Sequence, residues 1–414
     1  MTPATICKIW AIFDLFPLLG HISCLHEVIG LRITNYGSRK RREMPRIREL
    51  GIFESKLPPG AHNAITDVAG VAVGHYTLIA EEGAWTGNGP FRTGVTVIVP
   101  HEGNIFEEKV TAVTHTINGF GKVYGFEQVR ELGTIETPIA LTGTLNVPRV
   151  ADALMTIAIE QNPHIGLGFA ESGRQGYHSV NPVVGETSDG YLSDLQARPI
   201  GLAEVRAALA DAATGPVAEG VVGAGTGTSC FGWKGGIGSA SRVLPRRAGS
   251  FTIGVLVQTN YGSSEELTIC GVPVGQHVRP PKPEKRQEDG SIMIVLATDA
   301  PLDTRQLGRL CQRAAFGLAR TGSTCHGGSG DFVVAFSTAN RTPDRPAELG
   351  GERPYFREQP VMDLFSLAVI EAVEEAIYNS LFMAHTVVGR DGNTRYALPV
   401  DDVLAVMGRY GRHL

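Results

Sequence analysis

Three short runs of apolar residues constrain the fold of this chain more than any other feature. They are Phe251–Gln258, Ile292–Ala297 and Phe332–Phe336. In the first run both sets of alternating positions are largely apolar, so a strand formed there has no polar face to turn toward water. The sequence therefore predicts strands that are covered on both sides within a layered α/β structure.

Residues with helical periodicity follow several strand-like runs. Pro138–Thr142 is predicted to be a short buried strand, and the helix after it is expected to be capped by Asn146 and to carry Pro148 in its first turn. Asp303 is expected to cap a second helix. A long C-terminal helix is predicted because five apolar residues share one helical face, namely Leu367, Ile370, Val373, Ile377 and Leu381.

The arrangement of these elements favours two stacked sheets. Further strands are predicted at Asn63–His75 and Gly94–Pro100. Two sheets of covered strands with helices outside fit a four-layer αββα sandwich. A doubly wound parallel sheet fits the same pattern, and the pattern alone does not decide between them. The segment Arg279–Asp289 is rich in Pro, Lys and Glu and is predicted to be a surface loop.

Composition and charge argue against several classes of function. The chain has 414 residues and a formal net charge of −5, and its one basic run, Arg39–Arg42, is short. We therefore expect no nucleic-acid partner. The six cysteines show neither CxxC nor zinc-type spacing, and no nucleotide or metal motif is present. We expect no metal, no cofactor, and reduced cysteines in a cytoplasmic protein.

The first 43 residues differ from the rest of the chain. Residues 5–31 are rich in apolar side chains but are interrupted by Asp14, His21, His26 and Glu27, and no basic segment precedes them. An uninterrupted run of about 18 apolar residues is absent, which argues against a membrane span and a signal peptide. We predict that residues 1–43 are an extension outside the fold; a membrane-associating segment is the alternative.

The Gly249-Ser250 pair directly precedes the first apolar run. If the backbone broke within this pair, the Ser250 hydroxyl and a new α-amine would occupy one residue. Such an amine has a pKa of about 7.7–8.0, so part of it is unprotonated near neutral pH and can take the hydroxyl proton. The pair alone indicates only a turn, because Gly-Ser recurs elsewhere, as at Gly238-Ser239 and Gly290-Ser291.

Five longer blocks of the chain carry a family resemblance. They are Thr137–Val147, Pro182–Leu195, Glu219–Pro245, Gly249–Gly262 and Ser329–Arg341. In sequence and order they resemble the DmpA/BapA family of L-aminopeptidase/D-amidase-esterases and β-peptidyl aminopeptidases, from about residue 50 to the C-terminus. The resemblance implies an αββα sandwich like that of the N-terminal nucleophile hydrolases. It also implies a precursor that cleaves itself before a serine, and a homo-oligomer, often a tetramer.

The resemblance assigns both chemical steps to Ser250. Its hydroxyl is expected to attack the Gly249 carbonyl in an N-to-O shift, and the freed serine is then expected to attack the substrate acyl group. Cleavage there divides a single catalytic domain, residues 44–414, into 44–249 and 250–414. Family members commonly begin near the position of Met44, which supports placing residues 1–43 outside the fold.

Two sets of oxyanion donors are candidates. The glycine run Gly223–Thr228 is predicted to present backbone N–H groups, those of Gly223, Gly225, Thr226 and Gly227. The family often has asparagine where this chain has Val221, and valine cannot donate a hydrogen bond. Asn260, at the far end of the nucleophile strand, is the other candidate. The glycine run is less consistent with a phosphate loop, because the Walker lysine is missing.

Ser291 resembles a family serine that hydrogen-bonds near the nucleophile, and a plain strand-start serine is the alternative. In β-aminopeptidases a carboxylate accompanies that serine, but the position two residues after Ser291 is Met293. Four further residues are predicted to contact the substrate, with a structural role as the alternative for the last three: Leu145, Asn146, Asn118 and Trp233.

Two carboxylates in the second block are candidates for binding a substrate ammonium group. They are Glu186 and Asp189, and an Asx turn built on Asp189 is the alternative. Leu145 occupies a position that varies in the family and can meet the substrate amine when it is polar. Leucine cannot do so, which leaves the substrate preference open.

The sequence thus predicts a self-processing serine aminopeptidase or amidase-esterase. It is expected to hydrolyse N-terminal residues from small peptides, amides or esters, with no membrane partner. One alternative is acyl transfer, as in the ornithine acetyltransferases, which share a related self-cleaving fold but use threonine. The other is an uncleaved binding protein, for which Val221 and Leu145 are the arguments.

Overall fold

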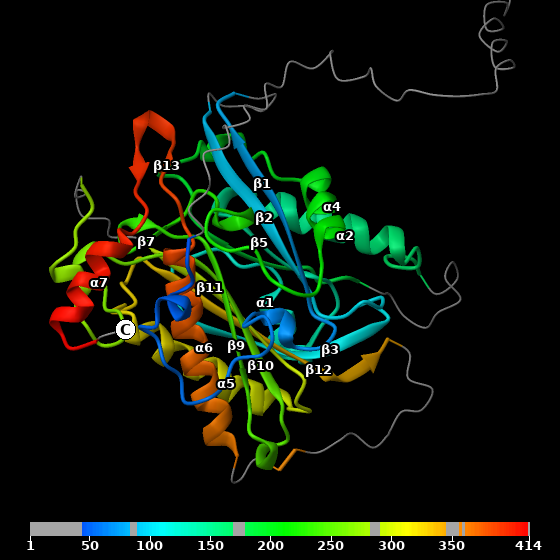
Figure 1. Ribbon diagram of the computed structural model, residues 1–414. Coiled ribbons are helices and arrows are strands. Elements are labelled where there is room, and N and C mark those ends of the chain that lie inside the picture. The colour runs from blue at the N-terminus through cyan, green and yellow to red at the C-terminus, as the bar shows by residue number, and fades with distance from the viewer. Residues whose placement is uncertain are drawn as a thin grey trace, which may run out of the picture. The chain divides into compact units, whose positions relative to one another are not determined.

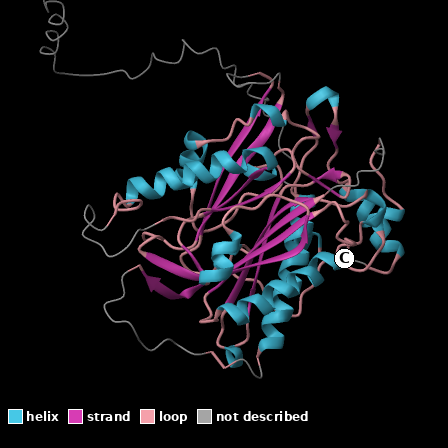
Figure 2. Ribbon diagram, turned by 180° about the vertical axis from the view of Figure 1, so that it is seen from behind, coloured by secondary structure: helices cyan, strands magenta, loops and turns pink. Residues whose placement is uncertain are grey.

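The computed structural model describes residues 44–82, 89–168, 179–281, 290–344, 356–357 and 361–412. Two β-sheets are stacked face to face, and helices cover their outer faces (Figures 1 and 2). The predicted extension, residues 1–43, lies outside the described residues, so its assignment stays a prediction.

The smaller sheet has the strand order β1-β2-β5-β6. Its strands pair antiparallel except for β5 and β6, which are parallel. Two helices, α2 and α4, pack on its outer face through a cluster that includes Val97, Ala140 and Leu154. The elements are β1 (Ala72–Ala80), β2 (Phe91–Val99), β5 (Ile139–Gly143), β6 (Val183–Thr187), α2 (Val147–Gln161) and α4 (Leu202–Asp211).

The larger sheet has the strand order β4-β3-β12-β11-β10-β9. Its pairs are antiparallel except for β11 and β12. Helices α5 and α6 cover its outer face. The elements are β3 (Glu108–Gly119), β4 (Thr134–Ile135), β9 (Ile237–Val243), β10 (Thr252–Asn260), β11 (Ser291–Thr298), β12 (Gly330–Pro343), α5 (Thr304–Arg320) and α6 (Met362–Phe382).

The apolar strand β10 packs against a different layer on each face. Ile253, Val255 and Val257 belong to the core beneath α5 and α6. Leu256 belongs to the core between the two sheets. Apolar residues at both alternating positions are therefore required, and the predicted αββα sandwich is confirmed. The doubly wound parallel sheet is excluded, because most strand pairs are antiparallel.

Several predicted boundaries are confirmed and one is wrong. Asp303 caps α5 by accepting a hydrogen bond from the Gln306 N–H at 2.7 Å. The predicted strand Asn63–His75 is mostly a loop, and β1 begins only at Ala72. The Asp67 carboxylate accepts the N–H groups of His62 and Ala64, which folds this segment into a turn. Such local side-chain bonds compete with a strand ladder.

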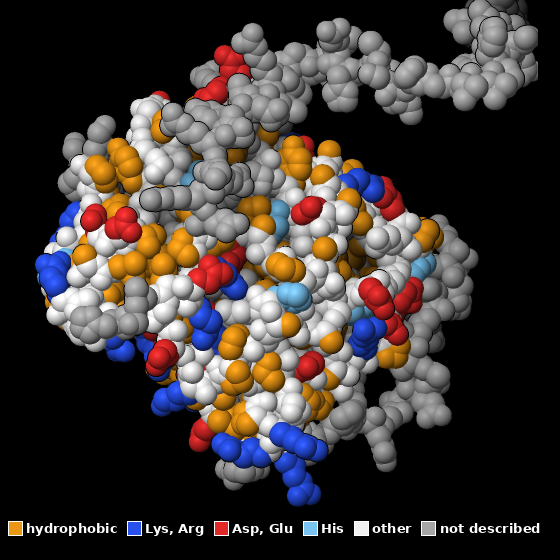
Figure 3. All heavy atoms as spheres, viewed as in Figure 1, with side chains coloured by type: hydrophobic (Ala, Val, Ile, Leu, Met, Phe, Trp, Pro, Cys, Tyr) orange, Lys and Arg blue, Asp and Glu red, His pale blue; other side chains and the backbone are white. Residues whose placement is uncertain are grey.

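The remaining helices and strands are short. They are α1 (Phe126–Leu132), α7 (Val400–Arg409), β7 (Ser229–Cys230), β8 (Trp233–Lys234), β13 (Val387–Val388) and β14 (Thr394–Arg395). Figure 3 shows apolar side chains in several groups over one face, with charged side chains between them. Within the described ranges, no helix combines enough length and hydrophobicity to cross a bilayer.

Candidate active site

Three neighbouring strands of the larger sheet meet at one edge, and their ends carry the candidate site. β10 ends at Asn260, β11 begins at Ser291 and β12 begins at Gly330. Asn260 is the antiparallel partner of Ser291, and Ser291 is in register with Gly330 in the parallel pair. Ser291 therefore lies between the last residue of one neighbour and the first residue of the other.

The peptide bond before Ser291 is held by several groups. The Gly290 carbonyl oxygen accepts hydrogen bonds from the Ser291 hydroxyl at 2.5 Å and from the Gly330 N–H at 3.0 Å. A Cβ at position 290 would lie 2.9 Å from the Tyr261 Cα, so the close approach of the chain after β10 requires glycine. Donors to a carbonyl oxygen also stabilise the oxyanion that forms when the carbonyl is attacked.

Asn260 lies next to Ser291 with its side-chain amide fixed. The residue is 4% exposed, and its Oδ1 accepts a hydrogen bond from the Ser229 N–H at 3.0 Å. Because the acceptor half of the amide is engaged, Nδ2 is the half that can donate to a ligand. This geometry is compatible with the predicted role of Asn260 as an oxyanion donor.

Ser329 and Asp331 form a buried pair at the start of β12. The Ser329 hydroxyl donates to Asp331 Oδ1 at 2.6 Å. Burial raises the pKa of Asp331, while Ser329, Cys325 and the Ile292 N–H offset part of the shift. Sequence reasoning missed this pair. The signal was available, since the expected serine-x-carboxylate pattern is absent at Ser291 but present at Ser329.

Asn118 supports the segment that carries Ser329. Its Nδ2 donates to the carbonyl oxygens of His326 and Gly327 at 3.2 Å each, and also to that of Ser329. Asn118 is the cross-strand partner of Asp331. These bonds give Asn118 a structural task beside the site, and its predicted contact with the substrate stays a prediction.

Glu186, at the end of β6, is a buried carboxylate near the start of β12. Its Oε1 accepts the Lys122 N–H at 2.9 Å. A Cβ on Gly121 would lie 3.3 Å from this oxygen and 3.2 Å from the Gly330 Cα, so the three groups surround one small space. Burial raises the pKa of Glu186, and hydrogen bonds to Lys122 and Thr144 offset part of the shift.

Asp189 follows Glu186 in the turn after β6 and is 1% exposed. Burial, with a smaller contribution from the Glu186 charge, raises the pKa of Asp189 to about 6. The backbone carbonyl of Asp189 closes the turn by accepting the N–H groups of Leu192 and Ser193. The side chain does not close it, so the Asx-turn alternative is wrong.

Comparison with known proteins identifies the family. Residues 63–395 match the model of peptidase family S58, which is most of the chain. The chain belongs to peptidase family S58. The predicted resemblance is thereby confirmed, because the similar proteins include both kinds of enzyme that the sequence resembles.

One named relative and two solved structures illustrate the similarity. β-Peptidyl aminopeptidase BapA of Sphingosinicella xenopeptidilytica is 40% identical over 383 residues, which cover 88% of this chain and 91% of BapA. The PH0078 protein of Pyrococcus horikoshii OT3 is 47% identical with a TM-score of 0.82, covering 89% of this chain and 100% of that one. The L-aminopeptidase D-Ala-esterase/amidase of Ochrobactrum anthropi, described as a variant of the Ntn hydrolase fold, is 37% identical with a TM-score of 0.81, covering 89% and 99%.

In this S58 peptidase, Ser250 lies far from Asn260 and Ser291. β10 begins at Thr252, and nine residues along one strand span about 26 Å, so Ser250 is at the opposite edge of the sheet from Asn260. Ser250 is exposed, has a φ of 54°, and follows a short 3-10 turn. The prediction that Gly249 and Ser250 share one site with Asn260 and Ser291 is therefore wrong.

Three of the four backbone donors predicted in the glycine run already have acceptors within the protein. The N–H of Gly223 donates to the Thr77 hydroxyl at 2.8 Å, that of Gly225 to the Val222 carbonyl, and that of Thr226 to the Gly223 carbonyl. These donors are already engaged. Gly227 is required for packing, because a Cβ there would lie 2.0 Å from the Arg92 carbonyl oxygen, and its role as a donor stays a prediction.

The other three residues predicted to contact the substrate, Leu145, Asn146 and Trp233, differ in exposure and in contacts. Leu145 is 37% exposed, in the turn before α2. Asn146 occupies the N-cap position of α2 without a capping side-chain bond, and its Oδ1 instead accepts the Ile200 N–H at 3.4 Å. Trp233 is buried in the core beneath α5 and α6, which contradicts a pocket-lining role.

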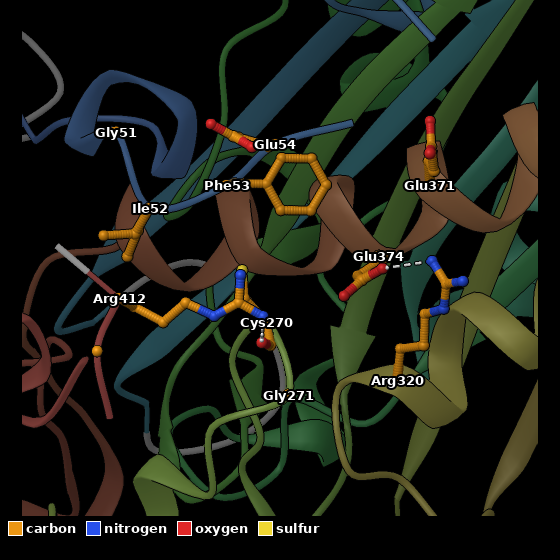
Figure 4. Close-up of a pocket in the computed structure, with 11 residues that line it drawn as sticks. Gly51, Ile52, Phe53, Glu54, Cys270, Gly271, Arg320, Glu371, Glu374 and Arg412 are labelled. Carbon is orange, nitrogen blue, oxygen red and sulfur yellow. Dashed lines mark hydrogen bonds and ion pairs between the residues drawn. The ribbon is translucent and has the colours of Figure 1, made fainter. Parts of the chain in front are cut away.

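A cavity of about 610 Å³ lies elsewhere, against the outer face of α6. Phe53, Glu371 and Arg412 line it, and Glu374 and Arg320 form an ion pair at 3.0 Å beside it (Figure 4). None of the residues at the strand ends described above lines this cavity, so it is separate from the candidate site of this S58 peptidase.

Proposed function

We propose that this S58 peptidase is a self-processing serine aminopeptidase whose chain breaks between Gly290 and Ser291, and whose nucleophile is Ser291. One observation carries the proposal. The register of β10, β11 and β12 gathers Asn260, Ser291 and the Ser329–Asp331 pair at one edge of the sheet. The same register leaves Ser250 at the other edge.

In the self-processing step, the Ser291 hydroxyl oxygen bonds to the Gly290 carbonyl carbon, and the bond from that carbon to the Ser291 nitrogen breaks. The hydroxyl proton passes to the departing nitrogen. The Gly330 N–H, at 3.0 Å from the Gly290 oxygen, stabilises the negative charge that this oxygen gains. Water then hydrolyses the ester, which leaves a Gly290 carboxylate and a Ser291 with a free hydroxyl and α-amine.

In the hydrolytic step, the α-amine of Ser291 takes the hydroxyl proton as the oxygen attacks the substrate acyl carbon. Asn260 Nδ2 donates to the oxyanion, and the leaving amine receives the proton. Water then releases the acyl group. Ser329, one residue before the register partner of Ser291 and hydrogen-bonded to Asp331, is positioned to move protons at this end of β11.

Glu186 accounts for the preference for a free N-terminus. Its carboxylate lies close to the Gly330 backbone, so a substrate ammonium group can pair with it while the acyl carbon is at Ser291. Asp189, three residues further along the chain, adds negative potential because its carboxylate is buried nearby. Two buried carboxylates favour the ammonium group of a substrate's N-terminus over an uncharged internal segment of a peptide.

The substrate class follows from this geometry and from the names of the relatives. We propose small peptides, amides or esters with a free N-terminal amine, in agreement with β-peptidyl aminopeptidase BapA and the L-aminopeptidase D-Ala-esterase/amidase. Both names describe acyl groups that bear an amine. We further propose a cytoplasmic location, which the free thiols of Cys230, Cys270, Cys311 and Cys325 support. We also propose a homo-oligomer, as the family resemblance implies.

The test compares two serine variants of the full chain. Ser291→Ala is expected to give a single uncut chain on denaturing electrophoresis and no hydrolysis of alanine p-nitroanilides. Ser250→Ala, the matched control, is expected to cleave and to hydrolyse normally. Loss of cleavage in Ser250→Ala with normal cleavage in Ser291→Ala would refute the proposal.

A further inference from the structure

Two buried cations lie behind the proposed oxyanion donor. Lys234 is fully buried and Arg395 is 1% exposed. Lys234 Nζ donates to the carbonyl oxygens of Gly225, Thr228 and Gly235 at 2.9, 2.7 and 2.8 Å. All three ammonium protons thus have acceptors. In the described part of the chain, Lys234 forms no ion pair with a carboxylate.

A short path of hydrogen bonds joins these cations to Asn260. Arg395 Nε donates to the Ser229 hydroxyl at 2.6 Å, and the Ser229 N–H donates to Asn260 Oδ1 at 3.0 Å. Ser229 and Lys234 are cross-strand partners in β7 and β8. Lys234 therefore holds the segment before Ser229, while Arg395 holds the Ser229 side chain itself.

Segments far apart in the sequence supply this arrangement. Arg395 comes from β14, which pairs with β13 in a small sheet at the periphery of the molecule (Figure 1). The Arg395 guanidinium also lies over the Tyr191 ring, 3.7 Å from its centre. The carbonyl of Tyr396, the residue after β14, accepts the Lys234 N–H at 2.7 Å, which joins this segment to β8.

We infer that Lys234 and Arg395 are positioning residues for Asn260, which they hold through Ser229 so that its Nδ2 donates to the reaction's oxyanion. The inference rests on the function proposed above. A hydrogen bond to Oδ1 fixes the orientation of the amide and polarises it, which strengthens its opposite N–H as a donor. Positive charge behind the donor also stabilises an oxyanion in front of it.

The energetics of burial favour this role over simple packing. Burying a cation without a carboxylate is unfavourable, and an apolar side chain of similar volume would fill the same space. Burial, together with the positive charge of Arg395, lowers the pKa of Lys234 to about 7. An anion formed near Asn260 would favour the protonated, positively charged form of Lys234 and would be stabilised by it.

The experiment is a double-mutant cycle on the self-processed enzyme. The probe is whichever of L-alanine and β-alanine p-nitroanilide the unmodified enzyme hydrolyses faster. Arg395→Lys and Ser229→Ala are each expected to lower kcat about tenfold or more, with KM changed less than threefold. In an Asn260→Ala background, the same substitutions are expected to have no further effect on kcat, because the group through which they act is gone.

The matched control is Arg242→Lys, a fully buried arginine that pairs with Glu375 at 2.7 Å, beneath α6. It is expected to lower stability without changing kcat per cleaved molecule. Equal fold losses of kcat for Arg395→Lys with and without Asn260 would overturn the inference, as would unchanged kcat in both Arg395→Lys and Ser229→Ala.

The cycle separates failure of this inference from failure of the proposed function. Asn260→Ala with full kcat would remove the oxyanion role on which both depend. A large loss in Asn260→Ala with additive losses from Arg395→Lys would leave the proposed function intact and refute only the positioning role. If Arg395→Lys does not fold, Ser229→Ala, which keeps the backbone N–H, decides the outcome.

Discussion

At the residue scale, Ser329 is distinguished by the carboxylate it contacts. Its hydroxyl donates to the buried Asp331, whereas Ser337, also buried on β12, donates to the Ala300 carbonyl. Ser329→Ala is expected to lower kcat about 10²-fold, in the range for loss of a proton-transfer group. Ser337→Ala is expected to lower stability by about 1 kcal/mol with kcat unchanged.

Steady-state kinetics and thermal unfolding of the two variants check this prediction. Loss of kcat in both variants, or in neither, would contradict a proton-transfer role for Ser329.

Asp189 makes stability depend on pH. Its pKa in the folded chain, about 6, is above its ordinary value of 3.8, so the folded chain binds the proton more tightly than the unfolded chain. Stability from this group is present below pH 3.8 and is lost as pH rises through 6. Asp189→Asn avoids this loss. At pH 8 it is expected to raise the free energy of unfolding by an amount on the order of 2–3 kcal/mol, and therefore to raise Tm, whereas no increase is expected at pH 4.

Thermal unfolding in the uncut Ser291→Ala background measures this difference without a second chain. Asp152→Asn, at an exposed position on α2, is the control and is expected to show no pH-dependent change. A lower Tm for Asp189→Asn at pH 8 than for the parent would contradict the assignment.

At the scale of elements, the fit between the end of β10 and the start of β11 depends on Gly290. Gly290→Ala places a Cβ 2.9 Å from the backbone of Tyr261, so the strand start must shift. We expect the variant to fold but to cleave itself at least about tenfold more slowly, because attack requires close alignment of the hydroxyl with the carbonyl. A time course of denaturing electrophoresis measures the rate.

Gly308→Ala is the matched control for this substitution. Gly308 lies within α5, and a Cβ there meets nothing within 4 Å. Alanine is expected to stabilise the helix by about 0.5–1 kcal/mol and to leave self-cleavage unchanged. Normal cleavage in Gly290→Ala would show that the alignment of β11 is not limiting.

The elements could be predicted from the sequence because burial on both faces leaves a pattern. The runs at β10, β11 and β12 are apolar at both alternating positions, and the structure buries them between two layers. Strand register leaves no such pattern. Ser250 and Ser291 both follow glycine and both precede an apolar run, so the local sequence does not separate them.

The direction of the strands separates these two serines. β10 and β11 are antiparallel, so their starting ends lie at opposite edges of the sheet. Asn260, at the end of β10, then joins Ser291 and not Ser250. The Ser329–Asp331 pair joins them because β12 runs parallel to β11. Long-range pairing, which one sequence does not show, therefore determines the candidate site.

At the scale of the whole molecule, the proposed break does not divide the fold into two bodies. In the larger sheet, β3, β9 and β10 precede the break, while β11 and β12 follow it and lie between β3 and β10. Separating the two chains would expose the cores on both sides of the sheet. We expect them to co-elute on size-exclusion chromatography in native buffer and to separate only in denaturant. Separate elution in native buffer would contradict this account.

The central claim is most directly tested by the N-terminal sequence of the smaller chain in the purified, unmodified protein. Our account predicts a chain that begins Ser-Ile-Met-Ile, with Ser291 as its first residue. A chain that begins Ser-Phe-Thr-Ile would place the break before Ser250, and a single uncut chain in active protein would show that no new N-terminus is needed; either result would contradict the account.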